Sequence, residues 1–262
     1  MYFANAKSGS STFLATLWNA ADLKRGKRSF SGDPRNHAIS PAQSLHRGTL
    51  NISDPAEVLE AVHFSVVRHP LVRLVSGYLD KIQRHTDNRT WRLFRHRYDL
   101  PRGARVSFPE FVELLAGDDP EQIDRHFRPQ ALNLACGSVR YAHIGQIENL
   151  SATKRFLKRH GVPVIRTHIP HKTSASEVLT EHLGDPAILR KALDVCERDF
   201  AAFNYAPGIE TVAPLGPNKP PRADTTLYRK VLTVYAARHR GRAPEKPGRP
   251  APVARTRRPR PT

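Results

Sequence analysis

The chain has 262 residues, of which 42 are Lys or Arg and 24 are Asp or Glu, and 39% are hydrophobic. This length and polarity suit one domain of about 200 residues with an appendage. No apolar run approaches the ~18 residues that span a membrane, and two cysteines are too few for a disulfide framework. We therefore expect a soluble, cytoplasmic protein without a transmembrane segment, and a peripheral contact with a membrane stays open.

The chain alternates strand-like and helix-like segments, which is typical of an α/β fold with a mainly parallel sheet. We expect a three-layer α/β/α domain over residues 1–207, with a P-loop-like phosphate-binding turn after its first strand. The predicted elements are a strand at 2–4, a helix from Phe13, loop over 24–55, strand 62–67, helix 71–79, an exposed loop or irregular helix over 84–107, helix 109–116, strand 141–145, helix 149–160, an extended run at 162–165 and helix 186–203.

Two further segments follow this domain. Residues 208–239 are rich in proline, with one candidate helix at 225–238. Residues 240–262 contain eight basic side chains, one acidic side chain and six prolines, a composition that buries too little apolar surface to order itself. We interpret 240–262 as a disordered basic tail, either simply solvated or in contact with a polyanion. The rest of the chain is also basic, which favours anionic ligands.

The turn from Lys7 to Thr12 reads Lys-Ser-Gly-Ser-Ser-Thr and leads from the first strand into a helix. Such a turn presents free N–H groups and the positive end of the helix dipole, which suits a phosphate. Gly9 allows close approach of the backbone, and Lys7 adds a positive charge. The Walker A pattern is absent because the lysine precedes the glycine, so an ordinary kinase or ATPase is disfavoured. Taken alone, the turn fits an ordinary capped helix better.

A second segment changes this balance. Residues 66–81 read Val-Val-Arg-His-Pro-Leu-Val-Arg-Leu-Val-Ser-Gly-Tyr-Leu-Asp-Lys. This string resembles the 3′-phosphate-binding signature of sulfotransferases that use 3′-phosphoadenosine 5′-phosphosulfate (PAPS). Arg68 and Ser76 occupy its two phosphate-contacting positions, and Arg73 matches a further family position. The turn then resembles the family's 5′-phosphosulfate loop, which implies that the donor is bound by Lys7, Ser8, Gly9, Ser10, Ser11 and Thr12.

Three later stretches, at 124–130, 141–150 and 199–205, resemble family motifs in the same order. The resemblance covers about residues 2–205 and points to the branch of carbohydrate O-sulfotransferases and their bacterial relatives. It implies PAPS as co-substrate, no metal, and a carbohydrate or other hydroxyl acceptor, for which an anionic character stays open. Ala6 departs from the pattern, which usually has proline there.

An acceptor hydroxyl needs a general base near neutral pH, for which histidine is suited. His37 resembles a His-x-x-Ser-Pro segment of bacterial relatives, and His126 lies in the 124–130 motif. The catalytic candidates are therefore Lys7, which would stabilise charge on the bridging oxygen, and one of these two histidines. Glu148 is expected to orient a loop or to pair with an arginine.

Two other functions stay open on the sequence alone. The charge favours a basic protein that binds nucleic acid or another polyanion, but no nucleic-acid motif is present, so we expect no specific nucleic-acid partner. The chain could also be a family member that binds a nucleotide without catalysis. The oligomeric state and the role of the basic stretch 84–105 are not indicated.

Overall fold

The structure is a computed structural model, which describes residues 2–9, 13, 17, 55–84, 88–162 and 174–239. The residues that lie outside the described part of the chain include Ser10, Ser11, Thr12, His37, residues 24–54 of the predicted loop and the basic tail 240–262. The elements in chain order are α3 (Pro55–Glu60), β1 (Phe64–Val67), α4 (Pro70–Tyr78), the π-helical turn η2 (Leu79–Gln83), α5 (Arg89–Arg97), α6 (Phe108–Ala116), α7 (Gln130–Asn133), β2 (His143–Gln146), α8 (Ser151–Arg159), α9 (Leu179–Leu183), α10 (Pro186–Phe203) and α11 (Thr226–His239).

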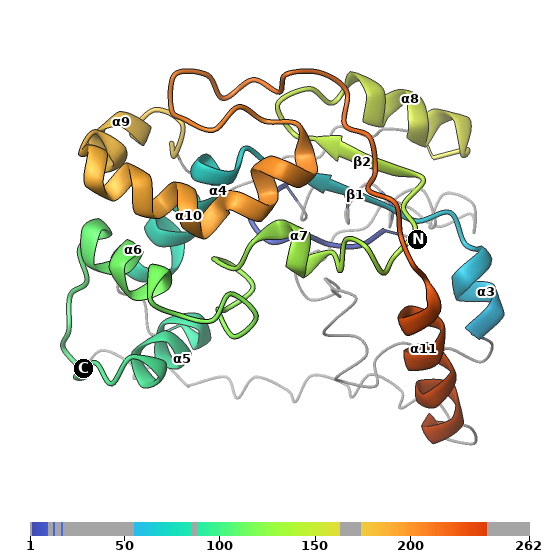
Figure 1. Ribbon diagram of the computed structural model, residues 1–262, viewed down its shortest axis with the longest axis horizontal. Helices are drawn as coiled ribbons and strands as arrows, with labels where there is room; N and C mark the ends of the chain where they lie inside the picture. The colour runs from blue at the N-terminus through green and yellow to red at the C-terminus, as the bar shows by residue number, and fades with distance from the viewer. Residues whose placement is uncertain are drawn as a thin grey trace, which may run out of the picture.

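Strand β1 has parallel neighbours on both sides. It pairs with β2 in parallel, with Phe64 opposite His143, and the two strands run side by side through the middle of the molecule (Figure 1). On the other side of β1, Tyr2 forms a parallel bridge to Phe64, and the Phe3 amide donates to the Phe64 carbonyl at 3.0 Å. The parallel pairing expected from the sequence is therefore confirmed for these strands.

The two faces of β1 are covered by different helices. Phe64 and Val66 pack against Phe156 of α8, whereas Val67 packs in a cluster with Val58 of α3. This follows from the alternation of side chains along a strand. Packing on both faces is compatible with the α/β class, and the complete three-layer arrangement stays a prediction.

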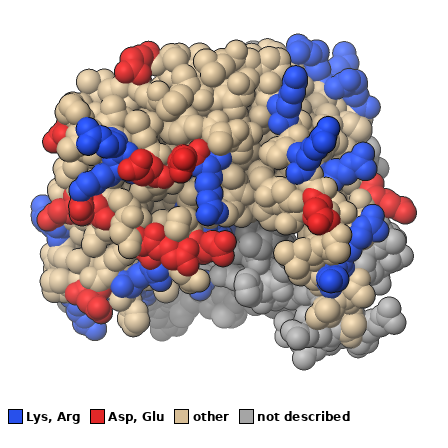
Figure 2. Space-filling view, viewed as in Figure 1, with Lys and Arg blue, Asp and Glu red and all other residues tan. Residues whose placement is uncertain are grey.

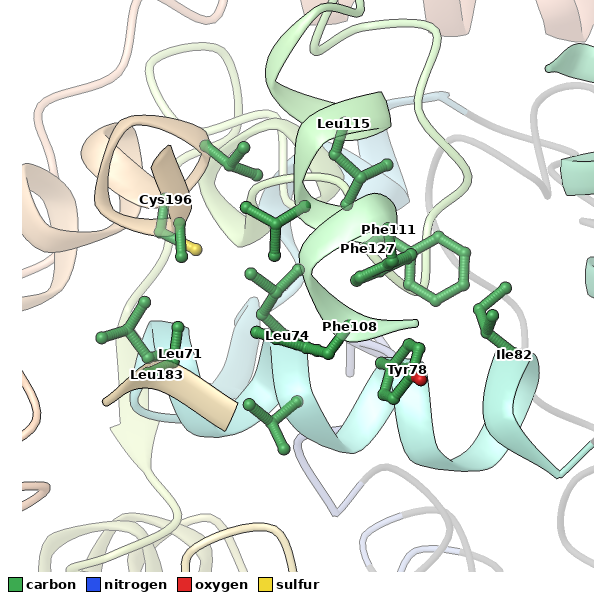
Figure 3. Packing of buried hydrophobic residues seen from close by; sticks show 14 of the residues in the cluster. Leu71, Leu74, Tyr78, Ile82, Phe108, Phe111, Leu115, Phe127, Leu183 and Cys196 are labelled. Atoms are coloured by element: carbon green, nitrogen blue, oxygen red, sulfur yellow. The ribbon is translucent and has the colours of Figure 1, made fainter. Parts of the chain in front are cut away.

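Helix α4 begins at Pro70, where a first-turn proline is tolerated. All nine of its residues are buried, as is typical of a helix in the interior of a domain. Figure 3 shows Leu74 and Tyr78 on the side of α4 that faces α6, near Phe108 and Phe111. Leu71 lies beside Leu183 of α9 in the same view, and Cys196 of α10 belongs to the same cluster. Arg73 is therefore buried with the other residues of α4, although it is charged.

Helix α5 corrects the expectation of a loop or irregular helix over 84–107. Residues 89–97 form a regular α-helix whose N-cap, Asn88, accepts a hydrogen bond from the Trp91 amide. Trp91 and Phe94 are buried on its inner face. The many arginines hide this short apolar stripe, because only three of the nine positions are strongly hydrophobic and one of these, Leu93, is exposed.

The other helices follow the sequence more closely. The helix predicted at 186–203 is confirmed residue for residue as α10, and α11 lies one residue later than 225–238. The helix predicted over 149–160 is α8, which begins at Ser151 with Leu150 as its N-cap and ends at Arg159. Tyr228 on α11 is buried in the cluster that includes α3, while the proposed boundaries of the segment 208–239 stay a prediction.

Charge is distributed unevenly over the face seen in Figure 2. Lys and Arg side chains gather over α8 at the upper right, whereas both signs mix over α6, α9 and α10 at the left. The exposed basic residues of α8 are Lys154, Arg155, Lys158 and Arg159. None of the described helices has the length and apolar character needed to cross a membrane.

We predict that Gly145→Ala destabilises the fold, because a Cβ at this position in β2 would lie 2.0 Å from the Thr153 Oγ1 atom of α8. Thr153 is fully buried and cannot move aside, so overpacking should cost about 1–3 kcal/mol in the free energy of unfolding. Urea denaturation measures this. The matched control is Gly103→Ala, where nothing lies within 4 Å. Equal stability of both variants would contradict the packing of α8 on β2.

Candidate active site

The loop of Lys7, Arg68 and Glu148 lie where the parallel strands end. Arg68 follows β1, Glu148 lies two residues after β2, and the segment 5–9 continues from the residues paired with β1. In α/β folds the carboxyl edge of the sheet is where ligands bind. Two buried polar side chains, Gln130 and Arg73, hold these segments together.

Gln130 is the first of these connections, and it is fully buried. Its Oε1 atom accepts hydrogen bonds from Asn5 Nδ2 at 2.8 Å and from Ser8 Oγ at 2.9 Å. The same oxygen accepts from the Arg68 amide at 2.9 Å, and Nε2 donates to the Arg68 carbonyl at 2.8 Å. Nε2 also lies 3.1 Å from Asp199 Oδ2. One amide group thus fixes the loop of Lys7 relative to the start of the Arg68 segment.

Arg73 is the second connection, with only 2% of its surface exposed. Its guanidinium donates to three backbone carbonyls: from Nε to Ala6 at 2.9 Å, from Nη1 to Arg128 at 2.9 Å and from Nη2 to Arg125 at 2.7 Å. A fork of planar donors suits this geometry, and lysine would not reproduce it. Arg73 therefore ties the loop of Lys7 to the segment that contains His126.

Lys7 is held in an unusual conformation at the tip of its loop. Its φ is +66°, in the left-handed region that non-glycine residues rarely adopt. Its Nζ atom lies 2.9 Å from Asp80 Oδ2. Burial lowers the pKa of the Lys7 ammonium, the ion pair with Asp80 opposes this shift, and the positive charges of Lys81 and Arg68 add to the lowering. Gln130 joins the loop of Lys7 to the Arg68 backbone, so both residues lie at the same edge of the sheet.

Asp80 is surrounded by cations. Lys81 Nζ lies 2.9 Å from its Oδ2 atom, and Arg84 Nη1 lies 3.8 Å from Oδ1. Burial alone would raise the pKa of the Asp80 carboxyl, but hydrogen bonds from Lys7 and Lys81 outweigh it and hold the pKa well below its ordinary value. Asp80 therefore stays ionised, and the surrounding cluster retains a net positive charge.

Glu148 orients the loop that follows β1, in agreement with the sequence-based expectation. Its Oε1 atom accepts a hydrogen bond from the His69 amide at 2.8 Å, and Oε2 accepts from the Tyr205 hydroxyl at 2.6 Å. Burial lowers the pKa of Arg68, and the charge of Glu148 opposes this. Because an arginine remains charged in proteins, Arg68 offers a cation at the end of β1.

His126 has the surroundings of an oriented base. Its Nδ1 atom lies 2.6 Å from Asp124 Oδ1, and the Thr90 hydroxyl is 3.3 Å from the same nitrogen. Hydrogen bonding of Nδ1 to a carboxylate favours the tautomer with the proton on Nδ1 and leaves Nε2 as the acceptor. Burial lowers the pKa of His126 and the Asp124 charge opposes it, with a net lowering from 6.5.

The structure gives different information on the residues expected to bind the 5′-phosphosulfate and the 3′-phosphate. Gly9 has φ +71°, and a Cβ there would lie 2.6 Å from Ile147 Cδ1, so the position requires glycine. The Ser8 hydroxyl donates to Gln130 and is turned inward. Ser76 is 2% exposed within α4, and its contact with a phosphate stays a prediction, as do the roles of Ser10, Ser11, Thr12 and His37.

Sequence reasoning gave no role to several residues that shape the site. Gln130 is the last residue of the 124–130 motif, and Asp80 and Lys81 are the last two residues of the 66–81 string. The sequence therefore shows their positions but not the residues that they contact. A pattern alone does not show that Gln130 reaches Asn5 across the fold. Among the described residues, no group of three or more His, Cys, Asp or Glu side chains is arranged to hold a metal ion.

Comparison with known proteins gives a family match over most of the chain. A model described as "Sulfotransferase family" matches residues 2–206. Carbohydrate sulfotransferase 14 of Mus musculus is 34% identical over 156 residues, which are 54% of this chain and 42% of that protein. The Danio rerio protein of the same name is 31% identical over 208 residues, 71% of this chain and 56% of that protein. The Homo sapiens protein is 29% identical over 156 residues, 54% of this chain and 42% of that protein.

This chain spans about half the length of the curated relatives that it matches. No solved structure shows a significant match.

We predict that Gln130→Met destabilises the protein by about 2–5 kcal/mol, because it leaves several buried donors and a carbonyl without partners. Urea denaturation should show this loss, whereas Gln122→Met, at an exposed position, should stay within about 0.5 kcal/mol of wild type. If both variants unfold at the same urea concentration, Gln130 does not connect the two loops.

Proposed function

This chain belongs to the sulfotransferase family, and we propose that it transfers a sulfuryl group from PAPS to a hydroxyl group of a carbohydrate. The proposal rests on one observation above all: Gln130 and Arg73 bring the segments of Lys7, Arg68 and His126 to one edge of the sheet. The names of the relatives support a carbohydrate as the acceptor.

The two ends of the donor would be bound by different parts of this site. In our proposal the loop of Lys7 and Gly9 holds the 5′-phosphosulfate, and Arg68 with Ser76 holds the 3′-phosphate. The positive charge of Arg68 acts on Lys7, which supports this arrangement, because the two cations would bind one nucleotide that is anionic at both ends. Charge-assisted hydrogen bonds to phosphate are about twice as strong as neutral ones.

The reaction would be an in-line displacement at sulfur. The acceptor oxygen forms a new S–O bond, the bond between sulfur and the 5′-phosphate oxygen breaks, and that oxygen keeps the electron pair. The products are a sulfate ester and adenosine 3′,5′-bisphosphate. Lys7 would stabilise the charge that develops on the leaving oxygen, since positioning and electrostatics dominate reactions of this kind.

His126 would accept the proton of the acceptor hydroxyl. Its Nδ1 atom is engaged by Asp124, so Nε2 is the nitrogen available for a proton. The lowered pKa keeps the imidazole neutral at pH 7, as a base requires. His37 stays the alternative base.

The test of the proposed function is calorimetric binding of adenosine 3′,5′-bisphosphate and AMP to the full chain at moderate salt. We expect a preference for the bisphosphate, because Arg68 would contact the phosphate that AMP lacks. Arg68→Ala should weaken bisphosphate binding by about 10–100-fold, the range expected for losing a hydrogen bond between charged groups, and should leave AMP nearly unchanged.

The control for this variant is Arg155→Ala, which removes an exposed arginine of α8 on the molecular surface. It should change the binding of both nucleotides slightly and equally. Wild-type protein that does not distinguish bisphosphate from AMP would refute the proposed function, and equal weakening of both by Arg68→Ala would refute the role of Arg68.

We further predict the pH dependence of turnover with a carbohydrate acceptor. Because the pKa of His126 is lowered from 6.5, kcat should be flat above that pH and fall only below it, where the imidazole gains a proton. Asp124→Asn removes an interaction that raises this pKa, so the acid limb should move to still lower pH. His126→Ala should reduce kcat by about 10²–10⁴-fold and abolish the limb. A normal rate in His126→Ala with a large loss in His37→Ala would assign the base to His37.

A further inference from the structure

Lys81 lies beside Lys7 although the two residues come from distant parts of the chain. Lys81 belongs to η2, the turn that continues α4. The Nζ atoms of Lys7 and Lys81 each lie 2.9 Å from the same oxygen, Oδ2 of Asp80. The two nitrogens are therefore within twice that distance of each other, a spacing at which both can reach the oxygens of one tetrahedral anion.

The position of Lys81 also relates the two ends of the proposed reaction. Its positive charge acts on Lys7, in the donor loop, and on His126, the candidate base. The sulfuryl group must pass between these two places during transfer. The Lys81 side chain is 26% exposed and the Lys7 side chain 15%, so both are partly open to a ligand. Single π-helical turns such as η2 occur frequently at functional sites.

We infer that Lys81 is a second cation of the transfer site, which contacts a terminal oxygen of the sulfuryl group, and that Asp80 is a positioning residue that presents Lys7 and Lys81 side by side. This inference rests on the proposed function. Each ammonium group has three N–H donors. With one donated to Asp80, both lysines keep donors for the ligand. Lys81 forms no covalent bond in the reaction.

The experiment compares calorimetric binding of PAPS with that of adenosine 3′,5′-bisphosphate, which lacks the sulfuryl group. Lys81→Gln should weaken the binding of PAPS at least about tenfold, as expected for the loss of a hydrogen bond between charged groups. The same substitution should weaken the binding of the bisphosphate much less. Lys81→Arg keeps the charge and should retain most of the affinity for PAPS.

Two control variants distinguish a direct contact of Lys81 with the sulfuryl group from a general effect of positive charge. Arg84→Gln removes a cation at the edge of the same cluster, and Lys154→Gln removes an exposed one on α8. Both should change the two affinities equally, and the change should fade as salt is raised. Equal loss of PAPS and bisphosphate in Lys81→Gln would overturn the inference about Lys81.

Asp80→Asn tests positioning against charge. Removal of a negative charge should tighten the binding of both nucleotides, but without the shared carboxylate the protein should lose its discrimination between PAPS and the bisphosphate. An unchanged ratio of the two affinities would overturn the role of Asp80. Wild-type protein that fails to prefer bisphosphate over AMP would overturn the proposed function and this inference together, which distinguishes that result from a failure in the variants alone.

Discussion

A buried guanidinium must have its donors satisfied, and this requirement at Arg73 organises much of the site. Desolvating an arginine is costly unless its N–H groups find partners. Here Arg73 donates to three carbonyls, all from segments without regular structure. The loop of Lys7 and the segment of His126 are thus fixed by one side chain that lies on α4, itself packed on all sides.

Gln130 complements Arg73 with the opposite chemistry. Arg73 donates hydrogen bonds to carbonyl groups, whereas the Oε1 atom of Gln130 accepts hydrogen bonds from three donors, one of which is the Arg68 amide. Both residues are interior, so the charged groups that would contact a ligand need not hold the loops in place. The loops of Lys7 and Arg68 are therefore held by a framework of buried contacts, and such preorganisation would favour the electrostatic catalysis that we propose.

The sequence indicates the elements of this fold better than it indicates their connections. Helix α10 could be predicted to the residue, since Asp185 caps it, Pro186 begins it and Asn204 ends it in the left-handed conformation. Helix α5 could not be predicted, because its arginines outnumber the two aromatic residues that hold it to the core. Motifs could single out Lys7 and Arg68 as candidates, but their contacts with Asp80 and Gln130 join residues far apart in the chain.

The backbone at Lys7 also has a meaning for how this protein can change. A left-handed conformation costs a lysine about 1–2 kcal/mol relative to glycine, so Lys7 occupies a position where glycine would let the chain fold more easily. Substitutions that stabilise the loop at this position would at the same time remove the ammonium group. Under the proposed function, stability and activity therefore make opposite demands at this one residue.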